Sequence, residues 1–168
     1  MSNNNVRVIV TGNGWMGGGI GSADTAMSRL FMRVKNELLI CAYSLTSGAD
    51  SILQGVNDVL ERGVSVTLII NRLSEQAFSV IDYLNCLLVN HPNLSVYDFC
   101  PITKGEDLHA KVMVADRTVA LVGSFNLSRR GLLENHELGV EITGEAVKDI
   151  ARAIDMIINS GLVKKVVL

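Results

Sequence analysis

The sequence predicts an α/β fold in a single domain, with helices flanking a mixed, largely parallel β-sheet. The chain has 168 residues, of which 48% are hydrophobic, so it can bury a substantial core. Only 5% of the residues are aromatic, so Val, Ile, Leu, Ala and Met must fill most of the interior. Short runs rich in β-branched residues alternate with helical segments, which is typical of buried strands in an α/β sheet. We expect residues 1–168 to form one domain.

Strands and helices are predicted in turn along the chain. Apolar runs predict strands at 6–11, 38–45, 64–71, 94–99, 108–115 and 118–123, and alternating polarity predicts another at 137–142. Helices are predicted at about 23–36, 74–90 and 145–159, and a further one runs from the turn residues Ser47, Gly48 and Asp50 to Arg62. Gly63 and the His91-Pro92-Asn93 break end two of these helices.

A glycine-rich segment within residues 1–22 follows the first predicted strand. Gly12, Gly14 and Gly17 match the G-x-G-x-x-G pattern of dinucleotide-binding loops. The acidic residue that completes this fingerprint is missing, so we favour a mobile surface loop, with a lid or an active-site entrance as the alternative. Trp15 lies in this loop and is the only tryptophan. It would stack on a base, join a subunit interface or anchor the loop.

The strongest functional pattern lies between residues 108 and 126. If 108–115 is a strand, His109 and Lys111 project to one face, and the opposite face carries Leu108, Ala110, Val112 and Val114. The imidazole and the ammonium are then two residues apart, roughly 6 to 7 Å along the strand. This spacing suits the binding of one phosphate group from two sides.

Ser124 and Asn126 repeat the two-residue spacing after the next predicted strand. Two neighbouring strands would therefore present four polar groups at one end of the sheet. Asp116 lies in the turn between these strands and on the wrong parity to join His109, so it is predicted to be structural and to contact backbone or a basic neighbour. The segment as a whole spells H-x-K-x4-D followed by G-S-x-N, in which Gly123 precedes Ser124.

These motifs resemble the phospholipase D superfamily, whose signature is H-x-K-x4-D with G-S-x-N close behind. Asn135, Glu137 and Gly139 resemble its later N-x-E-hydrophobic-G-V segment, and the likeness extends over about residues 28–160. The resemblance implies a phospholipase D-like fold and phosphodiester cleavage. Small single-motif bacterial members of the family resemble nonspecific endonucleases. Only one copy of the motif is present, and the resemblance implies that such chains pair to form one shared active site.

Phosphodiester cleavage needs a nucleophile, charge stabilisation and a proton donor. His109 would attack phosphorus and form a phospho-histidine, while Lys111, Ser124 and Asn126 would hold the nonbridging oxygens. Glu137 would accept a hydrogen bond from the far nitrogen of His109 and fix its tautomer. His91 and His136 are less well placed, so the second catalytic histidine is expected from another copy in a homodimer.

A metal-free and cofactor-free mechanism is predicted, because the chain has no H-E-x-x-H, no acidic cluster and no paired cysteines. The three cysteines, Cys41, Cys86 and Cys100, are too few for a disulfide framework, and the first two lie in apolar runs that predict core residues. The sequence shows no secretory signal and no apolar run long enough to span a bilayer. We therefore expect a cytoplasmic protein without a membrane anchor.

Charge bears on the choice of substrate. The formal net charge is -2, so polyanion binding must come from a local patch. Arg129 and Arg130 are predicted to steer an anionic backbone, and Lys104 to approach a bound phosphate, although an ordinary solvated loop is the alternative for Lys104. An endonuclease acting on DNA or RNA is the favoured function. The alternatives are a phospholipase D-like lipid hydrolase and a noncatalytic nucleic-acid-binding domain of a larger system.

Overall fold

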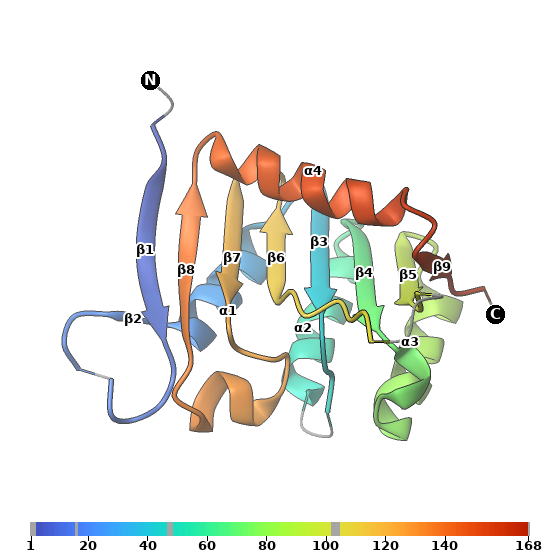
Figure 1. Ribbon diagram of the computed structural model, residues 1–168, viewed down its shortest axis with the longest axis horizontal. Helices are drawn as coiled ribbons and strands as arrows, with labels where there is room; N and C mark the ends of the chain where they lie inside the picture. The colour runs from blue at the N-terminus through green and yellow to red at the C-terminus, as the bar shows by residue number, and fades with distance from the viewer. Residues whose placement is uncertain (1–2, 16, 47–48, 102–104, 168) are drawn as a thin grey trace.

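The computed structural model describes residues 3–15, 17–46, 49–101 and 105–167, in which nine strands form one mixed sheet (Figure 1). The strands lie in the order β2-β1-β8-β7-β6-β3-β4-β5-β9. Their bounds are β1 Asn5–Val10, β2 Gly21–Ser22, β3 Glu37–Ala42, β4 Ser65–Asn71, β5 Leu94–Phe99, β6 Val112–Ala115, β7 Val119–Gly123, β8 Leu138–Thr143 and β9 Val163–Lys165. The predicted α/β class and the mixed sheet are confirmed.

The expectation that the sheet is largely parallel is wrong. Within the described sheet, the pairs β1–β2, β3–β4 and β4–β5 are parallel, and the other five neighbouring pairs are antiparallel. Parallel pairing needs a crossover connection, which the helices between β3, β4 and β5 supply. β6 and β7 are instead joined by a tight turn and β8 follows without a covering helix, so these strands pair antiparallel.

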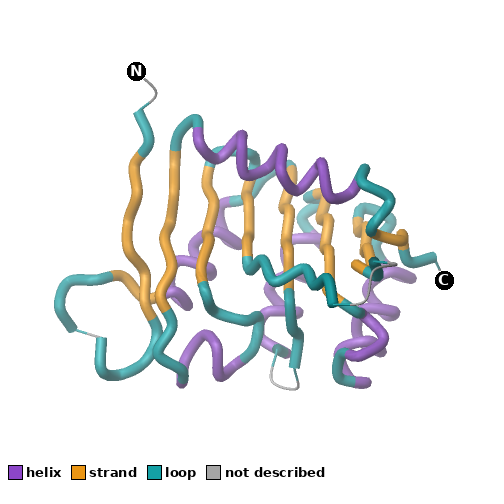
Figure 2. Tube along the Cα trace, in the orientation of Figure 1, coloured by secondary structure: helices purple, strands orange, loops and turns teal. Residues whose placement is uncertain are grey.

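Helices cover the two faces of the sheet unequally. The helices α1 (Ala23–Arg33), α2 (Asp50–Glu61) and α3 (Phe78–Asn90) lie on one face, and α4 (Ala146–Ile158) crosses the other (Figures 1 and 2). Strand alternation divides the core accordingly, since Leu38 and Ile40 join the core under the first three helices, and Leu39 and Cys41 join the core under α4. None of the helices in the described ranges is long and apolar enough to cross a bilayer.

The strand predicted at 108–115 is shorter than expected, because β6 begins at Val112. The backbone N–H of Leu108 donates to Asn71 Oδ1 at 2.9 Å, and that of His109 donates to the Asp107 carbonyl at 3.1 Å. These N–H groups are therefore not available to a neighbouring strand. The motif histidine lies on an anchored loop just before β6 rather than within the strand.

The helix predicted at 74–90 is divided in two. A 3₁₀ turn, η1 (Leu73–Glu75), comes first, and α3 begins only at Phe78. Between them, Gln76 accepts a hydrogen bond from Leu45 N at 2.8 Å and donates to the Asn71 carbonyl at 2.7 Å. This side chain ties the break in the helix to the ends of β3 and β4.

The two cysteines that were assigned to the core have different environments. Cys41 is buried as predicted, and burial raises the pKa of its thiol to about 12. The prediction for Cys86 is wrong, since it is exposed. The buried side chains of α3 are Val80, Leu84 and Leu87, which repeat at helical spacing, and Cys86 falls outside that stripe.

The turn between β6 and β7 is fixed by Asp116. Asp116 and Arg117 have φ values of 49° and 53°, as in the tight turns that join hairpin strands. The Asp116 carboxylate accepts backbone hydrogen bonds from Lys35, Asn36 and Glu37 at 2.9, 2.7 and 3.0 Å. The motif aspartate therefore joins the hairpin to the start of β3, at the edge of the sheet away from His109, and it contacts backbone as the sequence predicts.

Replacing Asp116 by alanine is expected to lower the free energy of unfolding by about 2–4 kcal/mol, because three N–H groups lose a charged acceptor and alanine is strained at positive φ. Burial raises the pKa of Asp116, but the three backbone hydrogen bonds outweigh it and the pKa is lowered. The stabilisation is therefore present at neutral pH and is lost as the pH falls below about 4. Urea unfolding at pH 7 and pH 3 measures both effects. Replacing the exposed Asp82 by alanine is the control, and an equal loss in both variants would contradict the assignment.

Candidate active site

The motif residues gather at one edge of the sheet. The carboxyl ends of β1, β3, β4 and β7 and the amino ends of β6 and β8 all lie at this edge (Figure 1). His109 and Lys111 precede β6, Ser124 follows β7, and Glu137 precedes β8. Antiparallel pairing of β6, β7 and β8 therefore brings segments that are up to 28 residues apart in the sequence to one place.

His109 and Lys111 are in direct contact. The Lys111 ammonium lies 3.1 Å from each of the two ring nitrogens of His109 and donates to the His109 carbonyl at 2.9 Å. The imidazole itself is exposed. A phosphodiester could therefore approach the His109 ring from solvent, and the Lys111 ammonium would bind the same phosphate.

Lys111 is the only charged residue among the buried residues in the described parts of the chain, with 6% of its surface exposed. Burial lowers the pKa of its ammonium, and the negative charge of Glu137 opposes this effect. A buried cation costs free energy unless it is paired, so a bound phosphate would complete its environment. This arrangement favours anion binding beside His109.

Tyr43 is a member of the site that the motif did not reveal. It follows β3, its ring centroid lies 4.4 Å from that of His109 with 58° between the planes, and the Lys111 ammonium lies 4.8 Å from the Tyr43 ring centroid. An aromatic face therefore supports both motif side chains. In the sequence, only the position of Tyr43 at the end of an apolar strand could have indicated that it belongs to the site.

The expectation that Glu137 accepts a hydrogen bond from His109 is wrong within one chain. Glu137 Oε2 accepts a short hydrogen bond from the Ser124 hydroxyl, and Oε1 accepts one from Asn135 Nδ2 at 3.2 Å. Pairing of β7 with β8 brings Ser124 against Glu137, since the Ser124 N–H also donates to the Leu138 carbonyl at 3.1 Å. Glu137 thus orients Ser124, and its charge acts on Lys111.

The loop that carries His109 is anchored by Asp107. Asp107 accepts hydrogen bonds from Arg72 Nε at 2.7 Å and from Asn71 Nδ2 at 3.2 Å, and these bonds lower the pKa of its carboxyl. Asn71 is 4% exposed and also accepts from Leu108 N. Both anchoring residues come from the end of β4 and its first following residue, so β4 sets the position of His109 although it is distant in sequence.

Gly123 is required by a close contact with an aromatic ring. A Cβ atom on Gly123 would lie 2.3 Å from the Phe125 ring, and one on Gly139 would lie 2.5 Å from it. The buried Phe125 ring therefore lies across the backbones of β7 and β8 where the two glycines pair. This contact gives the glycines of the G-S-x-N and E-L-G-V segments a packing role directly beside Ser124 and Glu137.

Asn126 is held by its backbone, while its side chain keeps an open acceptor. The Ser128 N–H donates to the Asn126 carbonyl at 2.8 Å, and Gly131 packs so closely that a Cβ there would lie 2.4 Å from the same oxygen. Asn126 Oδ1 is buried without a hydrogen-bond partner among the described residues. No contact in the described structure joins the Asn126 side chain to His109.

The basic residues predicted to bind substrate are not all placed at the site. Lys104 lies outside the described residues. Arg129 and Arg130 lie at the site edge, on and beside the π-helical turn η2 (Arg130–Glu134), with side chains 70% and 79% exposed. Arg117, a further basic residue of the motif region, cannot join a substrate groove at this edge, because it lies in the β6–β7 turn at the opposite edge and pairs with Glu37 and Asp155 at 2.8 and 2.6 Å.

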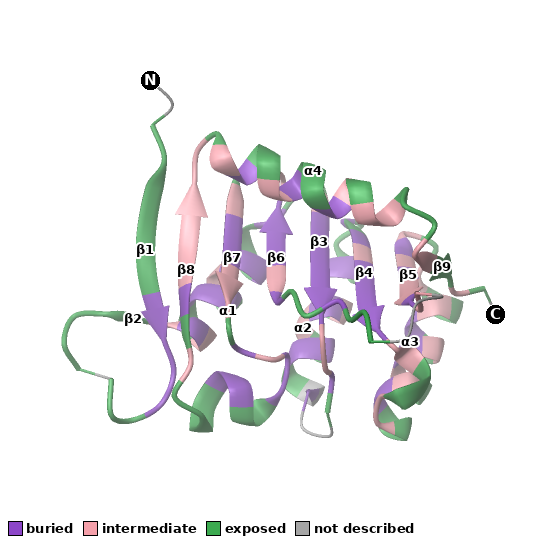
Figure 3. Ribbon diagram, in the orientation of Figure 1, coloured by how far each residue is buried: buried purple, intermediate pink, exposed green. Residues whose placement is uncertain are grey.

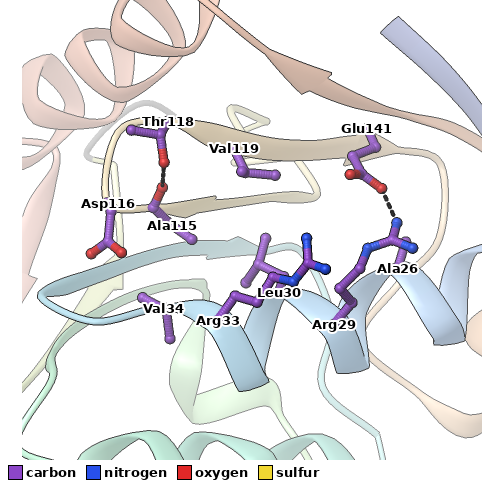
Figure 4. Close-up of a pocket in the computed structure, with 10 residues that line it drawn as sticks. All are labelled: Ala26, Arg29, Leu30, Arg33, Val34, Ala115, Asp116, Thr118, Val119 and Glu141. Atoms are coloured by element: carbon purple, nitrogen blue, oxygen red, sulfur yellow. Dashed lines mark hydrogen bonds and ion pairs between the residues drawn. The ribbon is translucent and has the colours of Figure 1, made fainter. Parts of the chain in front are cut away.

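A small cavity of about 80 Å³ lies elsewhere, between α1 and the strands β6 to β8 (Figure 4). Figure 4 shows Arg29 bonded to Glu141 on its wall, and no motif residue other than Asp116 lines it. Within the described ranges, no group of three or more His, Cys, Asp or Glu side chains is arranged to hold a metal ion. The motif edge is the better candidate for chemistry.

A family model described as the phospholipase D-like domain of cardiolipin synthase matches residues 27–159. The chain belongs to the phospholipase D superfamily. Its predicted fold within that family is confirmed by solved structures, although at identities that show the fold alone. Nuc, a phospholipase D family member from Salmonella typhimurium, superposes with a TM-score of 0.76 at 19% identity, over 98% of this chain and 99% of that one.

Three further proteins are similar to this chain, two by structure and one by sequence. NucT from Helicobacter pylori gives a TM-score of 0.73 at 18% identity, over 95% of this chain and 98% of NucT. Phosphatidylserine synthase from Haemophilus influenzae gives 0.71 at 17% identity, over 97% of this chain and 40% of that one. The DISARM protein DrmC from Bacillus paralicheniformis is 28% identical over 134 residues, and the match spans 79% of this chain but 55% of DrmC. These comparisons support a phosphodiesterase of the superfamily.

Proposed function

We propose that this chain is a metal-independent endonuclease that cleaves DNA or RNA through a phospho-histidine. The observation that carries the proposal is the exposed His109 ring in contact with the buried Lys111 ammonium. Cleavage of an anionic diester requires a nucleophile that can reach phosphorus and a cation that stabilises the phosphate oxygens. Asn126 lies at the same edge, and its side-chain amide is the further group proposed to bind the nonbridging oxygens.

The reaction proceeds in two displacements. A neutral nitrogen of His109 attacks phosphorus, the bond from phosphorus to the leaving oxygen breaks, and an acid protonates that oxygen. Water then attacks phosphorus, gives its proton to a base, and breaks the phosphorus–nitrogen bond, which restores His109. Lys111 stabilises the negative nonbridging oxygens in both steps. The Ser124 hydroxyl donates its proton to Glu137 Oε2, so these two side chains hold each other at the rim of the site.

The proton transfers require a second imidazole, which a homodimer supplies. His136 is engaged by its Nε2 atom, which accepts from Gly14 N at 3.1 Å, and His91 contacts Asn57 at 3.0 Å after the last turn of α3. Neither histidine is free to act beside His109. We infer that the His109 of a second copy serves as acid and then as base on the opposite side of the phosphate.

The face of the sheet that carries α4 is suited to this dimer. Strand registers place Val8, Val140, Val122 and Val112 in one row across four neighbouring strands. Val8 remains 47% exposed, and α4 crosses only one end of this face, leaving β7 and β8 uncovered toward the site edge (Figure 3). An apolar groove of about 360 Å³ lies beside this row. An uncovered apolar face next to half an active site favours association with a second copy.

We also propose that the protein acts as part of a larger system. Similarity to the DISARM protein DrmC supports a role in a larger nucleic-acid-processing system, and we place that role in the cytoplasm. A phospholipid hydrolase is the second candidate. It is favoured by the likeness to a cardiolipin synthase domain and to phosphatidylserine synthase, together with the apolar groove.

Cleavage in the presence of a chelator tests the proposed reaction. Purified protein is incubated in EDTA with labelled single-stranded DNA, duplex DNA, RNA and phosphatidylglycerol or cardiolipin vesicles. We expect a nucleic acid to be cleaved at an undiminished rate in EDTA. Turnover of lipid alone would favour the hydrolase, and binding of nucleic acid without turnover of any diester would favour a noncatalytic domain.

A further inference from the structure

The glycine-rich loop is fastened to the candidate site rather than separate from it. Thr11, which directly follows β1, is 2% exposed and exchanges hydrogen bonds with Glu137: its N–H donates to the Glu137 carbonyl at 2.9 Å, and its Oγ1 accepts from Glu137 N at 3.2 Å. The Thr11 hydroxyl also donates to the Asn135 carbonyl at 2.7 Å. The base of the loop and the glutamate of the site therefore form one rigid unit.

His136 shapes the loop that follows. Gly12 and Gly14 pack against its ring so closely that a Cβ atom would lie 2.9 and 2.7 Å from it, and Gly14 N donates to His136 Nε2 at 3.1 Å. Trp15 then meets the same ring edge to face, with the centroids 5.7 Å apart and the planes at 86°. The glycine-rich loop thus holds the indole against His136, the residue that precedes Glu137 in the sequence.

The held indole is still accessible and has positive charge nearby. Trp15 is 41% exposed. The turn η2 ends where Asn135 N donates to the Arg130 carbonyl at 2.7 Å, so Arg130 belongs to the same unit as Thr11 and His136. Among the described residues, Arg129 and Arg130 form ion pairs only with the Glu134 carboxylate, at 3.4 and 3.9 Å, which leaves an excess of positive charge on an exposed turn.

An aromatic surface beside exposed arginines is the combination that binds unpaired nucleotides, because the arginines attract the backbone and the ring stacks on a base. In a duplex the bases are already stacked on their neighbours and cannot reach such a ring. We propose that Trp15, with Arg129 and Arg130, forms a stacking subsite for an unpaired nucleobase next to the cleaved phosphate. This inference rests on the proposed function and specifies its substrate as single-stranded nucleic acid.

Binding measurements in a His109→Ala background separate this inference from catalysis. The probes are two fluorescent single strands of equal length, one with all its bases and one made of abasic sites, followed by anisotropy. Trp15→Ala is expected to weaken binding of the base-bearing strand about 10-fold and to remove most of the preference over the abasic strand. Trp15→Phe, which keeps an aromatic face, should retain most of that preference.

Phe78→Ala is the matched control, since Phe78 is 82% exposed at the start of α3 and contacts neither His136 nor the glycine loop in the described structure. It should leave both affinities unchanged. Because Trp15 is the only tryptophan, quenching of its fluorescence by the base-bearing strand reports stacking directly. Equal affinities for Trp15→Ala and its parent on the base-bearing strand would overturn the subsite. Absence of cleavage by the wild type would instead refute the proposed function and leave this binding result standing.

Discussion

Replacing His109 by alanine is expected to lower the rate of nucleic-acid cleavage by at least about 10⁴-fold, because the reaction loses the atom that attacks phosphorus. The effect should appear in kcat, while the affinity for substrate changes little, since Lys111 and the exposed arginines remain. Initial rates on a labelled oligonucleotide in EDTA measure it. The fold should survive, because the His109 side chain is exposed and its backbone contacts are kept.

His91→Ala is the control for this experiment. His91 contacts Asn57 at 3.0 Å after α3, away from the motif edge, and its loss should change the rate by less than about twofold. If His109→Ala retained a tenth or more of the wild-type rate while binding substrate normally, another group would have to be the nucleophile. The proposed reaction would then be wrong even if the protein is a nuclease.

Replacing Val140 by aspartate is expected to turn the proposed dimer into a monomer and to lower the rate by about 10²–10⁴-fold, the usual contribution of general acid–base catalysis. Val140 lies between Val8 and Val122 on the face that α4 leaves partly uncovered. A charge there would lie in the apolar centre of the interface without a partner. Sedimentation equilibrium and cleavage rates measured over the same range of protein concentration test both effects together.

Folding and association must be distinguished in this test. Val8→Asp introduces the same charge on the neighbouring strand β1, at a residue that is 47% exposed, so the monomer should tolerate it better. Val89→Asp, at a residue 72% exposed on α3, is the control and should leave the assembly and the rate unchanged. A folded monomer of either interface variant that cleaves at the wild-type rate would contradict the shared active site.

The sequence predicted the fold wherever local pattern and burial agree. The buried strands β3 and β4 lie at the predicted runs, because a largely apolar sequence is what a strand covered on both faces requires. β5 matches its predicted range through the alternation of Leu94, Val96 and the residues between them.

The spacing of His109 and Lys111 correctly placed the two side chains together even though β6 starts after them. Side-chain alternation still holds before β6, since Leu108, Ala110 and Val112 line the groove under α4 while His109 and Lys111 contact each other. The Lys111 carbonyl also accepts from Gly123 N of β7 at 3.2 Å.

The errors arise where distant contacts decide the outcome. The short strand β9 exists because it pairs with the edge of β5, and nothing in Val163–Lys165 indicates that partner. Glu137 binds Ser124 rather than His109 because the register of β7 with β8 sets its neighbour. Tyr43 joins the site only through the antiparallel pairing of β3 with β6. Such pairings follow from the assembled sheet and leave little trace in the local sequence.

The stereochemistry at phosphorus tests most directly whether a covalent bond forms between phosphorus and His109 during the reaction. An oligonucleotide with one chiral phosphorothioate diester at the cleavage site is hydrolysed in isotopically labelled water, and the configuration of the product is determined. Each in-line displacement inverts phosphorus, so two successive displacements predict net retention. Net inversion would show a single direct attack by water and would contradict the phospho-histidine.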